Sequence, residues 1–282
     1  MNTPLVELFT IPTLRDHVDW RDVMITQHCA YLDRKCLKIR KSQPEVSIGT
    51  CSVAQSLKQE RAIIICPHRF LERGQIFLDC LHLLTLHEPG NELHRVAEVE
   101  IPGGSVDYFL VSVRDGKVVD FVGIELQALD TTGTLWPPRQ RFLNSQGVAE
   151  AVDAVHSTNP YGVNWKMTAK TTLIQLHHKI ETFEAIGKHL VLVLQDALLE
   201  YMRREFNFGH IQTAVLGNSM HFHTYALQEQ ESAYHIKLMS RSSTDANGIA
   251  TSLGLQINAN VELEVIVRLL QNKISARTLL RI

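Results

Sequence analysis

SVDYFLVSVRDGKVVDFVGIELQ, residues 105–127, is the stretch that decides the fold. Two strand-like apolar runs flank Asp115-Gly116, and an Asp-Gly pair in this setting is a strong signal for a β-hairpin. One strand opens with Asp107, and the other ends in Glu125-Leu126-Gln127, so two carboxylates and an amide gather at one end of the hairpin. We expect the rest of the chain to be organised around it.

The register of this hairpin decides how the two carboxylates meet. With a two-residue loop alone, Asp107 lies opposite about residue 124, whereas one extra loop residue or a bulge moves its partner to Glu125, on the same face. In either register the two carboxylates are within reach of one cation, and Gln127 shares a face with Glu125 because they are two residues apart. Mg²⁺ prefers hard oxygen ligands, so the pair predicts a magnesium site. Such a site suits phosphodiester hydrolysis.

The alternative is that these polar residues only face solvent on one side of the hairpin. Against it, Glu125 follows the apolar run Phe121–Ile124, which is typical of a core strand. A carboxylate at the end of a core strand is costly unless it is paired or liganded. The sequence therefore favours a functional site without excluding the alternative.

The composition is that of an ordinary soluble protein of 282 residues with a formal net charge of −2. This length suffices for one large domain or two small ones. A near-neutral charge gives no global signal for nucleic acid, so a DNA-binding surface would be a local basic patch. No stretch approaches the ~20 apolar residues of a membrane helix, and we see no secretory signal. We expect a cytoplasmic protein with no membrane association.

All five cysteines lie between residues 29 and 80, and their odd number argues against a disulfide framework. Residues 1–70 are expected to be mostly irregular, with a short strand at Ala62–Ile65. A metal site would staple such a segment, and iron and zinc both suit four thiolates. The alternative is a set of separate buried thiols, and Cys80 is expected in the core. The candidate ligands are Cys29, Cys36, Cys51 and Cys66.

The densest basic run, residues 34–41, contains Cys36 and lies between Cys29 and Cys51. A solvated face is the default interpretation of such a run. Beside a metal-stapled module it would instead grip phosphates, because cationic side chains displace counterions from DNA. The candidate DNA contacts in this run are Lys38, Arg40 and Lys41.

The remaining sequence predicts an α/β protein. Asn164 is a predicted N-cap and Gly187 a predicted C-terminal residue of the longest helix. His221 and His223 share one strand face, which we expect to be exposed to solvent rather than metal-binding. The predicted elements are a helix over 73–88, a strand over 96–101, a polar surface loop over 130–146, a helix over 165–186, a buried strand over 190–194, a helix over 197–206, strands over 220–227 and 234–239, and an amphipathic helix over 261–280.

The arrangement Asp…Glu-x-(Lys/Gln) on a hairpin, followed by a helix and a strand, resembles the PD-(D/E)xK nuclease superfamily, and more specifically the NotI-type restriction endonucleases. This resemblance implies an α/β fold with a restriction-endonuclease-like core of helix, mixed central sheet, helix and strand. It places a four-cysteine module at 1–70 and the nuclease domain, with a C-terminal extension, at 71–282. The residues that carry it are Arg40-Lys41-Ser42, Ile48–Cys51, Ile65–Pro67, Arg69-Phe70, Gly104–Asp107, Glu125–Gln127 and Asn164–Lys170.

The resemblance implies a homodimeric, Mg²⁺-dependent type II restriction endonuclease that cuts double-stranded DNA at a specific sequence, with a structural iron or zinc on the four cysteines. Asp107 and Glu125 would bind Mg²⁺. Gln127 would be the third catalytic residue, but it stands where most of the superfamily has lysine, and an amide orients water without holding charge. Lys166 or Lys170 on the next helix is a candidate substitute and a candidate DNA contact.

Two other functions remain open from the sequence alone. The departure at Gln127 allows a non-catalytic, sequence-specific DNA-binding protein on a nuclease scaffold. The same core would also serve a structure-selective DNA repair nuclease. Discrete fragments with a common end sequence indicate restriction, and cuts at junctions or flaps indicate repair.

Overall fold

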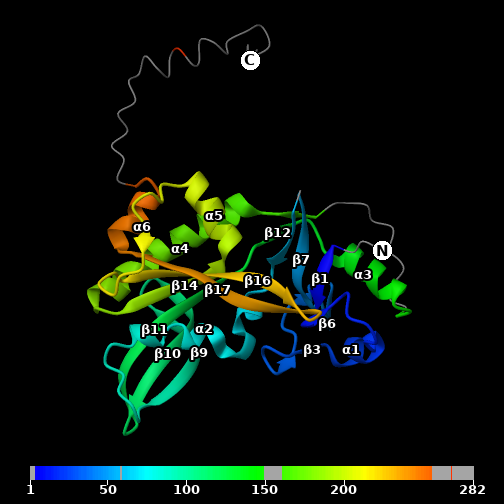
Figure 1. Cartoon of the computed structure of the whole chain (residues 1–282), viewed down its shortest axis with the longest axis horizontal. Coiled ribbons are helices and arrows are strands. Elements are labelled where there is room, and N and C mark those ends of the chain that lie inside the picture. The colour runs from blue at the N-terminus through cyan, green and yellow to red at the C-terminus, as the bar shows by residue number, and fades with distance from the viewer. Residues whose placement is uncertain (1–3, 58, 149–160, 256–267, 269–282) are drawn as a thin grey trace.

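The computed structural model describes residues 4–57, 59–148, 161–255 and 268 (Figure 1). It is a mixed α/β protein built on a large mixed sheet, with six α-helices in the described residues. The order across this sheet is β15-β17-β16-β14-β11-β10-β9, and β11, β14 and β16 are mutually parallel neighbours. Its strands are β9 (Glu92–Ile101), β10 (Gly104–Arg114), β11 (Lys117–Gln127), β14 (His189–Gln195), β15 (Gln212–Thr213), β16 (Met220–Gln230) and β17 (Ala233–Thr244).

Strands β10 and β11 form the predicted hairpin. Asp115 and Gly116 both have positive φ, 50° and 71°, as a two-residue turn of this handedness requires. Ser112 pairs with Asp120 but Val113 pairs with Val118, so Val119 is an extra residue and forms a bulge. This bulge sets the register for the whole mouth of the hairpin.

Strand β14 is buried on both faces, as its continuous apolar run predicts. Leu190, Leu192 and Leu194 belong to one apolar core, and Val191 and Val193 belong to the other. Figure 1 shows α4, α5 and α6 gathered on one side of the sheet. Short helices from the segment before β9 contribute to the other core. The covering helices are α4 (Trp165–Ala185), α5 (Asp196–Glu205), α6 (Ala246–Ser252), η1 (Pro67–Gly74), α2 (Gln75–Leu78) and η2 (Leu81–Leu83).

The prediction that residues 1–70 are mostly irregular is wrong. This segment carries a four-stranded sheet of order β2-β1-β7-β8 and two small hairpins, β3-β4 and β5-β6. Most of these strands are too short for a periodic pattern to show in the sequence. The elements are β1 (Leu5–Leu8), β2 (Ile11–Pro12), α1 (Trp20–Thr26), β3 (His28–Cys29), β4 (Arg34–Lys35), β5 (Ile39–Arg40), β6 (Gln43–Ser47), β7 (Thr50–Leu57) and β8 (Gln59–Ile64).

Two further predictions need correction. The helix expected over 73–88 is two short pieces, α2 and η2. It begins only after Arg73 and Gly74, which have positive φ of 50° and 65°, and Leu84, with a ψ of 80°, ends the second piece. The loop expected over 130–146 contains α3 (Trp136–Ser145), whose prolines lie in the first turn, where a missing N–H costs nothing. Arg139 in that helix is fully buried rather than on the surface. A small pair of strands, β12 (Thr131–Thr132) and β13 (Gly162–Val163), completes the described elements.

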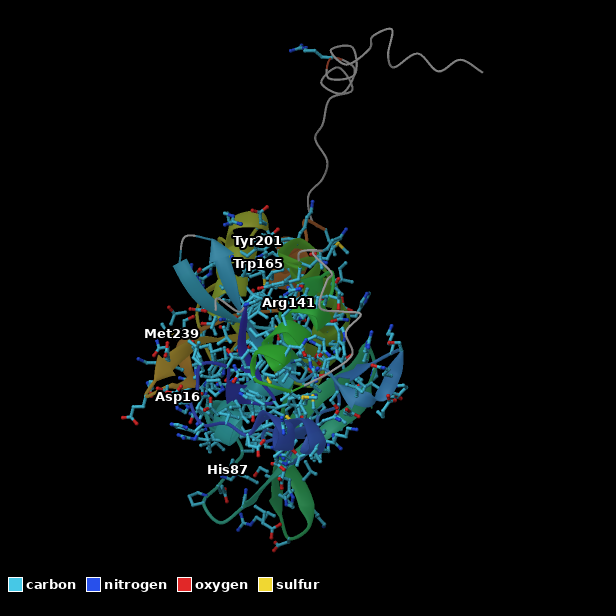
Figure 2. All side chains as sticks on the ribbon, turned by 90° about the vertical axis from the view of Figure 1, so that its right-hand side faces the viewer. Asp16, His87, Arg141, Trp165, Tyr201 and Met239 are labelled. Carbon is cyan, nitrogen blue, oxygen red and sulfur yellow. The ribbon has the colours of Figure 1, made fainter. Side chains whose placement is uncertain are left out.

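The other predicted elements that lie within the described residues are confirmed, although several strands extend beyond their predicted ends. Helix α4 begins after Asn164, which occupies the N-cap position without a side-chain cap bond, and Gly187 follows its end with a φ of 62°. Helices α4 and α5 contact each other through Trp165 and Tyr201, whose ring centroids are 5.9 Å apart (Figure 2). The helix predicted over 261–280 lies outside the described residues. Within the described part of the chain, none of the helices has both the length and the apolar character needed to cross a membrane.

Candidate active site

Asp107 and Glu125 lie opposite each other at the mouth of the hairpin. Tyr108 pairs with Ile124, so the next pair toward the strand ends is Asp107 with Glu125, on one face of the sheet. The backbone N–H of Leu126 donates to Asp107 Oδ2 over 2.8 Å. The register that the bulge creates therefore brings both carboxylates to one place.

Glu125 lies on β11, and its side chain is largely buried against α4. Its side chain is only 13% exposed, and Lys179 Nζ donates to its Oε1 over 2.7 Å. Burial raises the pKa of Glu125 to about 7, a hydrogen bond from Lys179 opposes that rise, and the charge of Asp107 adds to it. A cation that binds near this carboxyl group therefore stabilises its charged form.

Gln127 is engaged by its own surroundings. Its Oε1 accepts a hydrogen bond from Thr172 Oγ1 at 2.8 Å, and its Nε2 donates to the backbone oxygen of Ala128 at 2.6 Å. The amide is thus tied to α4 and to the next residue of its own chain. Gln127 shares a face with Glu125, as expected, but both of its polar atoms already have protein partners.

The cation beside the carboxylates is Lys179, which sequence reasoning missed. Lys166 and Lys170, the two candidates on the same helix, are exposed to solvent. Lys179 has a side chain only 9% exposed and comes three residues after the buried Leu176. A lysine on the apolar stripe of an otherwise amphipathic helix is the sequence signal that could have identified it.

The N-terminal segment reaches the same end of the hairpin. Asp107 and His68, the second residue of η1, interact electrostatically, although burial lowers the pKa of His68 overall. Arg34 acts on His68 as well, so part of the basic run lies near the carboxylates.

Further along the run, the Arg40 guanidinium lies 4.3 Å from the centroid of the Trp136 ring. Lys38, Arg40 and Trp136 line a cavity of about 360 Å³, and Lys41 is exposed.

The four candidate cysteine ligands are neighbours but do not form a ligand set in this structure. All four are free thiols, and burial raises the pKa of three of them, with additions from one another. Across residues 4–57, 59–148 and 161–255, no three His, Cys, Asp or Glu side chains are arranged to hold a metal ion. The thiol pairs that interact electrostatically are Cys29 with Cys36, Cys51 with Cys66, Cys51 with Cys29, Cys66 with Cys36, and Cys66 with Cys29. Cys80 lies in the core, as predicted.

The prediction that His221 and His223 lie on a solvent-exposed strand face is wrong. Both rings are buried, at 1% and 0% exposure. Strand β16 lies inside the sheet between β14 and β17, and the short helices cover its face. Cys80 Sγ lies 3.7 Å from His223 Nδ1, and the His82 ring stacks on His223 with centroids 5.9 Å apart. A strand's period cannot reveal whether its polar face is covered.

Comparison with known proteins supplies the family. A search of curated protein sequences gives no match. The family model described as "Restriction endonuclease NotI" matches residues 29–234, well over half of the chain. This region begins at Cys29 and includes Asp107, Glu125, Gln127 and Lys179. The chain belongs to the NotI restriction endonuclease family and is a site-specific deoxyribonuclease that hydrolyses phosphodiester bonds in DNA.

Proposed function

We propose that this protein is a Mg²⁺-dependent type II restriction endonuclease whose catalytic metal binds Asp107 and Glu125, with Gln127 beside them. The observation that carries the proposal is the opposed carboxylate pair at the hairpin mouth, one member of which is buried against a helix. The hairpin β10-β11 is followed along the chain by α4 and then β14 in one mixed sheet, which supports a PD-(D/E)xK core. The division into residues 1–70 and 71–282 stays a prediction.

The residues present suit magnesium. Mg²⁺ in phosphoryl-transfer sites uses one or two protein carboxylates and completes its shell with waters and substrate phosphate, so a third protein ligand is not required. When bound, the ion would offset negative charge on the phosphorane-like transition state and favour ionisation of the attacking water. Leu126 N–H holds Asp107 in place for this task, and α4 keeps water away from Glu125.

The hydrolysis is a displacement at phosphorus by water. The water oxygen bonds to phosphorus while the bond from phosphorus to the leaving sugar oxygen breaks. One proton of the water passes to solvent, and the leaving oxygen takes a proton from solvent. The residues of the hairpin contribute position and charge, which is where most of the catalysis of phosphoryl transfer lies.

The deciding experiment replaces each carboxylate by its isosteric amide. We expect Asp107→Asn and Glu125→Gln to abolish Mg²⁺-dependent cleavage of plasmid DNA while leaving DNA binding in place. Asp115→Asn, in the turn of the same hairpin, is the matched control and should cleave normally. Mapped fragment ends with one common sequence would identify restriction. Wild-type cleavage by either active-site variant would overturn the assignment.

We also propose that the exposed and half-buried cations near the site contact phosphates: Lys38, Arg40, Lys41, Lys166 and Lys170. Each true contact should lower the slope of log affinity against log salt by about 1 when the lysine or arginine is removed. Exposed Arg204, on α5, provides a matched control. An unchanged slope for the variants would place the DNA elsewhere.

The four thiols are further proposed to close around a structural iron or zinc ion. Their mutual proximity and free state support this, because four thiolates make a complete tetrahedral shell for either metal. Cys29→Ser and Cys51→Ser should lower the metal content of purified protein, whereas Cys80→Ser should not. Equal metal content in all three variants would remove the proposal.

A further inference from the structure

Lys179 brings a positive charge to the carboxylate pair from outside the hairpin. It projects from α4, and its ammonium is 2.7 Å from Glu125 Oε1. The contact uses Oε1, and a carboxylate has a second oxygen with which to bind another cation. A lysine in this place can therefore coexist with a metal on Glu125.

The chain leaves room for this lysine by means of a glycine turn. Gly103, between β9 and β10, and Gly104, the first residue of β10, have φ of 98° and 130°, which L side chains rarely adopt. A Cβ on Gly104 would lie 3.3 Å from Lys179 Cε, and one on Gly103 would overlap the backbone oxygen of His178. The turn thus packs directly against α4 at the lysine and fixes its distance from the hairpin.

Residue 127 cannot supply the same charge. Gln127 is neutral, and its amide is bonded to Thr172 and Ala128. Thr172 and Lys179 lie two turns apart on α4, so the helix contacts the hairpin once at Gln127 and once at Glu125. A lysine on α4 can therefore supply the positive charge that the neutral Gln127 does not.

We propose that Lys179 is a catalytic residue of this endonuclease: its ammonium contacts the attacking water and a non-bridging phosphate oxygen, and so provides from α4 the cation that position 127 lacks. The inference rests on the proposed function of Asp107 and Glu125. Charge accumulates on the non-bridging oxygens as water adds, and a preorganised cation in a largely buried site stabilises it strongly.

The test moves the charge from one position to the other. Lys179→Gln should reduce the cleavage rate at saturating DNA by ~10²-fold or more, the usual effect of removing one such donor, with DNA binding in EDTA unchanged. Adding Gln127→Lys to that variant should recover at least ~10-fold of the loss, because it restores a cation on the same face. Lys179→Arg keeps the positive charge but changes the shape of the side chain. Lys237→Gln, which removes an exposed lysine on β17, is the control.

The outcomes separate this inference from the function on which it rests. A purely structural ion pair would not be relieved by a lysine at 127, so a loss in Lys179→Gln that the second substitution fails to reduce overturns the proposal. Wild-type rates in Lys179→Gln, with far-ultraviolet circular dichroism showing a folded protein, overturn it as well. If the wild-type protein fails to cleave, or Asp107→Asn still cleaves, the proposed function falls instead.

Discussion

The Glu7 carboxylate and the Arg69 guanidinium form a buried ion pair far along the sequence from each other. Their atoms are 2.9 Å apart with side chains 1% and 0% exposed, and Ser52 also donates to Glu7. Burial raises the pKa of Glu7, and the charge of Arg69 opposes that rise. The pair joins β1 to η1, which carries His68 toward the candidate active site.

Removing one partner of this pair should lower the free energy of unfolding more than removing both. Arg69→Met leaves Glu7 buried without its cation, and we expect the free energy of unfolding to fall by about 3–5 kcal/mol in urea denaturation. The double variant Glu7→Gln/Arg69→Met should recover part of that loss. Arg61→Met, which breaks the more exposed pairs with Asp196 and Glu200, should cost about 1 kcal/mol or less. Equal losses at the two arginines would contradict this account.

The buried histidines of β16 predict a dependence of stability on pH. Burial lowers the pKa of His221 to about 4 and of His223 to about 3, with His189, His82 and Arg241 adding in the same direction. Between pH 6.5 and about 4 the unfolded chain therefore binds protons that the folded chain does not. Each ring should therefore lower the free energy of unfolding by about 2 kcal/mol between pH 7 and pH 5, whereas the raised pKa of Glu125 acts in the opposite direction.

Denaturation curves at several pH values test this prediction. His223→Leu should flatten the dependence, whatever its effect on stability at pH 7, because it removes one of the two buried rings. His17→Gln, at an exposed position, should leave the slope as it is. A pH dependence that is the same in His223→Leu as in the wild-type protein would show that this ring does not change its protonation on unfolding.

Among single residues, those whose positions depend only on the hairpin could be predicted from the sequence. Asp107 and Glu125 meet because a turn and one bulge set their register, and both are local features. Lys179 could not be assigned to them, because its contact depends on how α4 docks. The burial of His221 and His223 likewise depends on elements distant in sequence, so their exposure was predicted wrongly.

Helix α4 packs tightly against strand β11 at Gly123. A Cβ at this position would lie 2.4 Å from Cζ of Phe183, within the ring that fills the space above the strand. Lys179 and Phe183 lie one turn apart on this helix, so the same close approach sets the depth of the lysine. The position of the catalytic charge is therefore a property of the packing between two elements.

Gly123→Ala should push α4 away from the sheet. We expect a loss of about 1–3 kcal/mol in the free energy of unfolding, as for other overpacked cores. Cleavage should fall more steeply than DNA binding, because the carboxylate pair and Lys179 separate. Gly209→Ala, whose added Cβ meets nothing within 4 Å, is the control for both measurements. Unchanged cleavage in a destabilised Gly123→Ala would separate the packing from the chemistry.

Among the elements, those with many residues and a clear period were predictable. The hairpin, α4 and β14 are examples, since each carries its pattern over several residues or turns. The segment 73–88 keeps helical apolar spacing, but it divides into α2 and η2 and ends at Leu84, whose ψ is 80°, and the apolar pattern does not show this division. Helix α3 was missed because its first turn contains two prolines, which resemble loop residues when read without a helix boundary.

The whole molecule brings its N-terminal sheet and its large sheet into shared apolar cores. Leu5, Val53 and Ile63 belong to the same cluster as the inner face of α4, and Ile64 belongs to the cluster on the other face of the sheet. Figure 1 shows the N-terminal elements beside the sheet rather than apart from it. This arrangement was not predictable, because it requires contacts between segments that share no local pattern.

If the chain forms the homodimer that its family resemblance implies, the position of the carboxylates predicts how the two strands of DNA are cut. Asp107 and Glu125 come from one hairpin of one chain, so each protomer would carry a complete carboxylate pair and cut one strand. Wild-type protein mixed and re-equilibrated with excess Asp107→Asn should then nick supercoiled plasmid and accumulate the open-circular form. A mixture of Asp107→Asn with Glu125→Gln should stay inactive, because no chain in it has both carboxylates. Recovery of activity in that mixture would mean that the pair is completed between chains, and a monomeric mass in sedimentation with and without specific DNA would exclude the dimer itself.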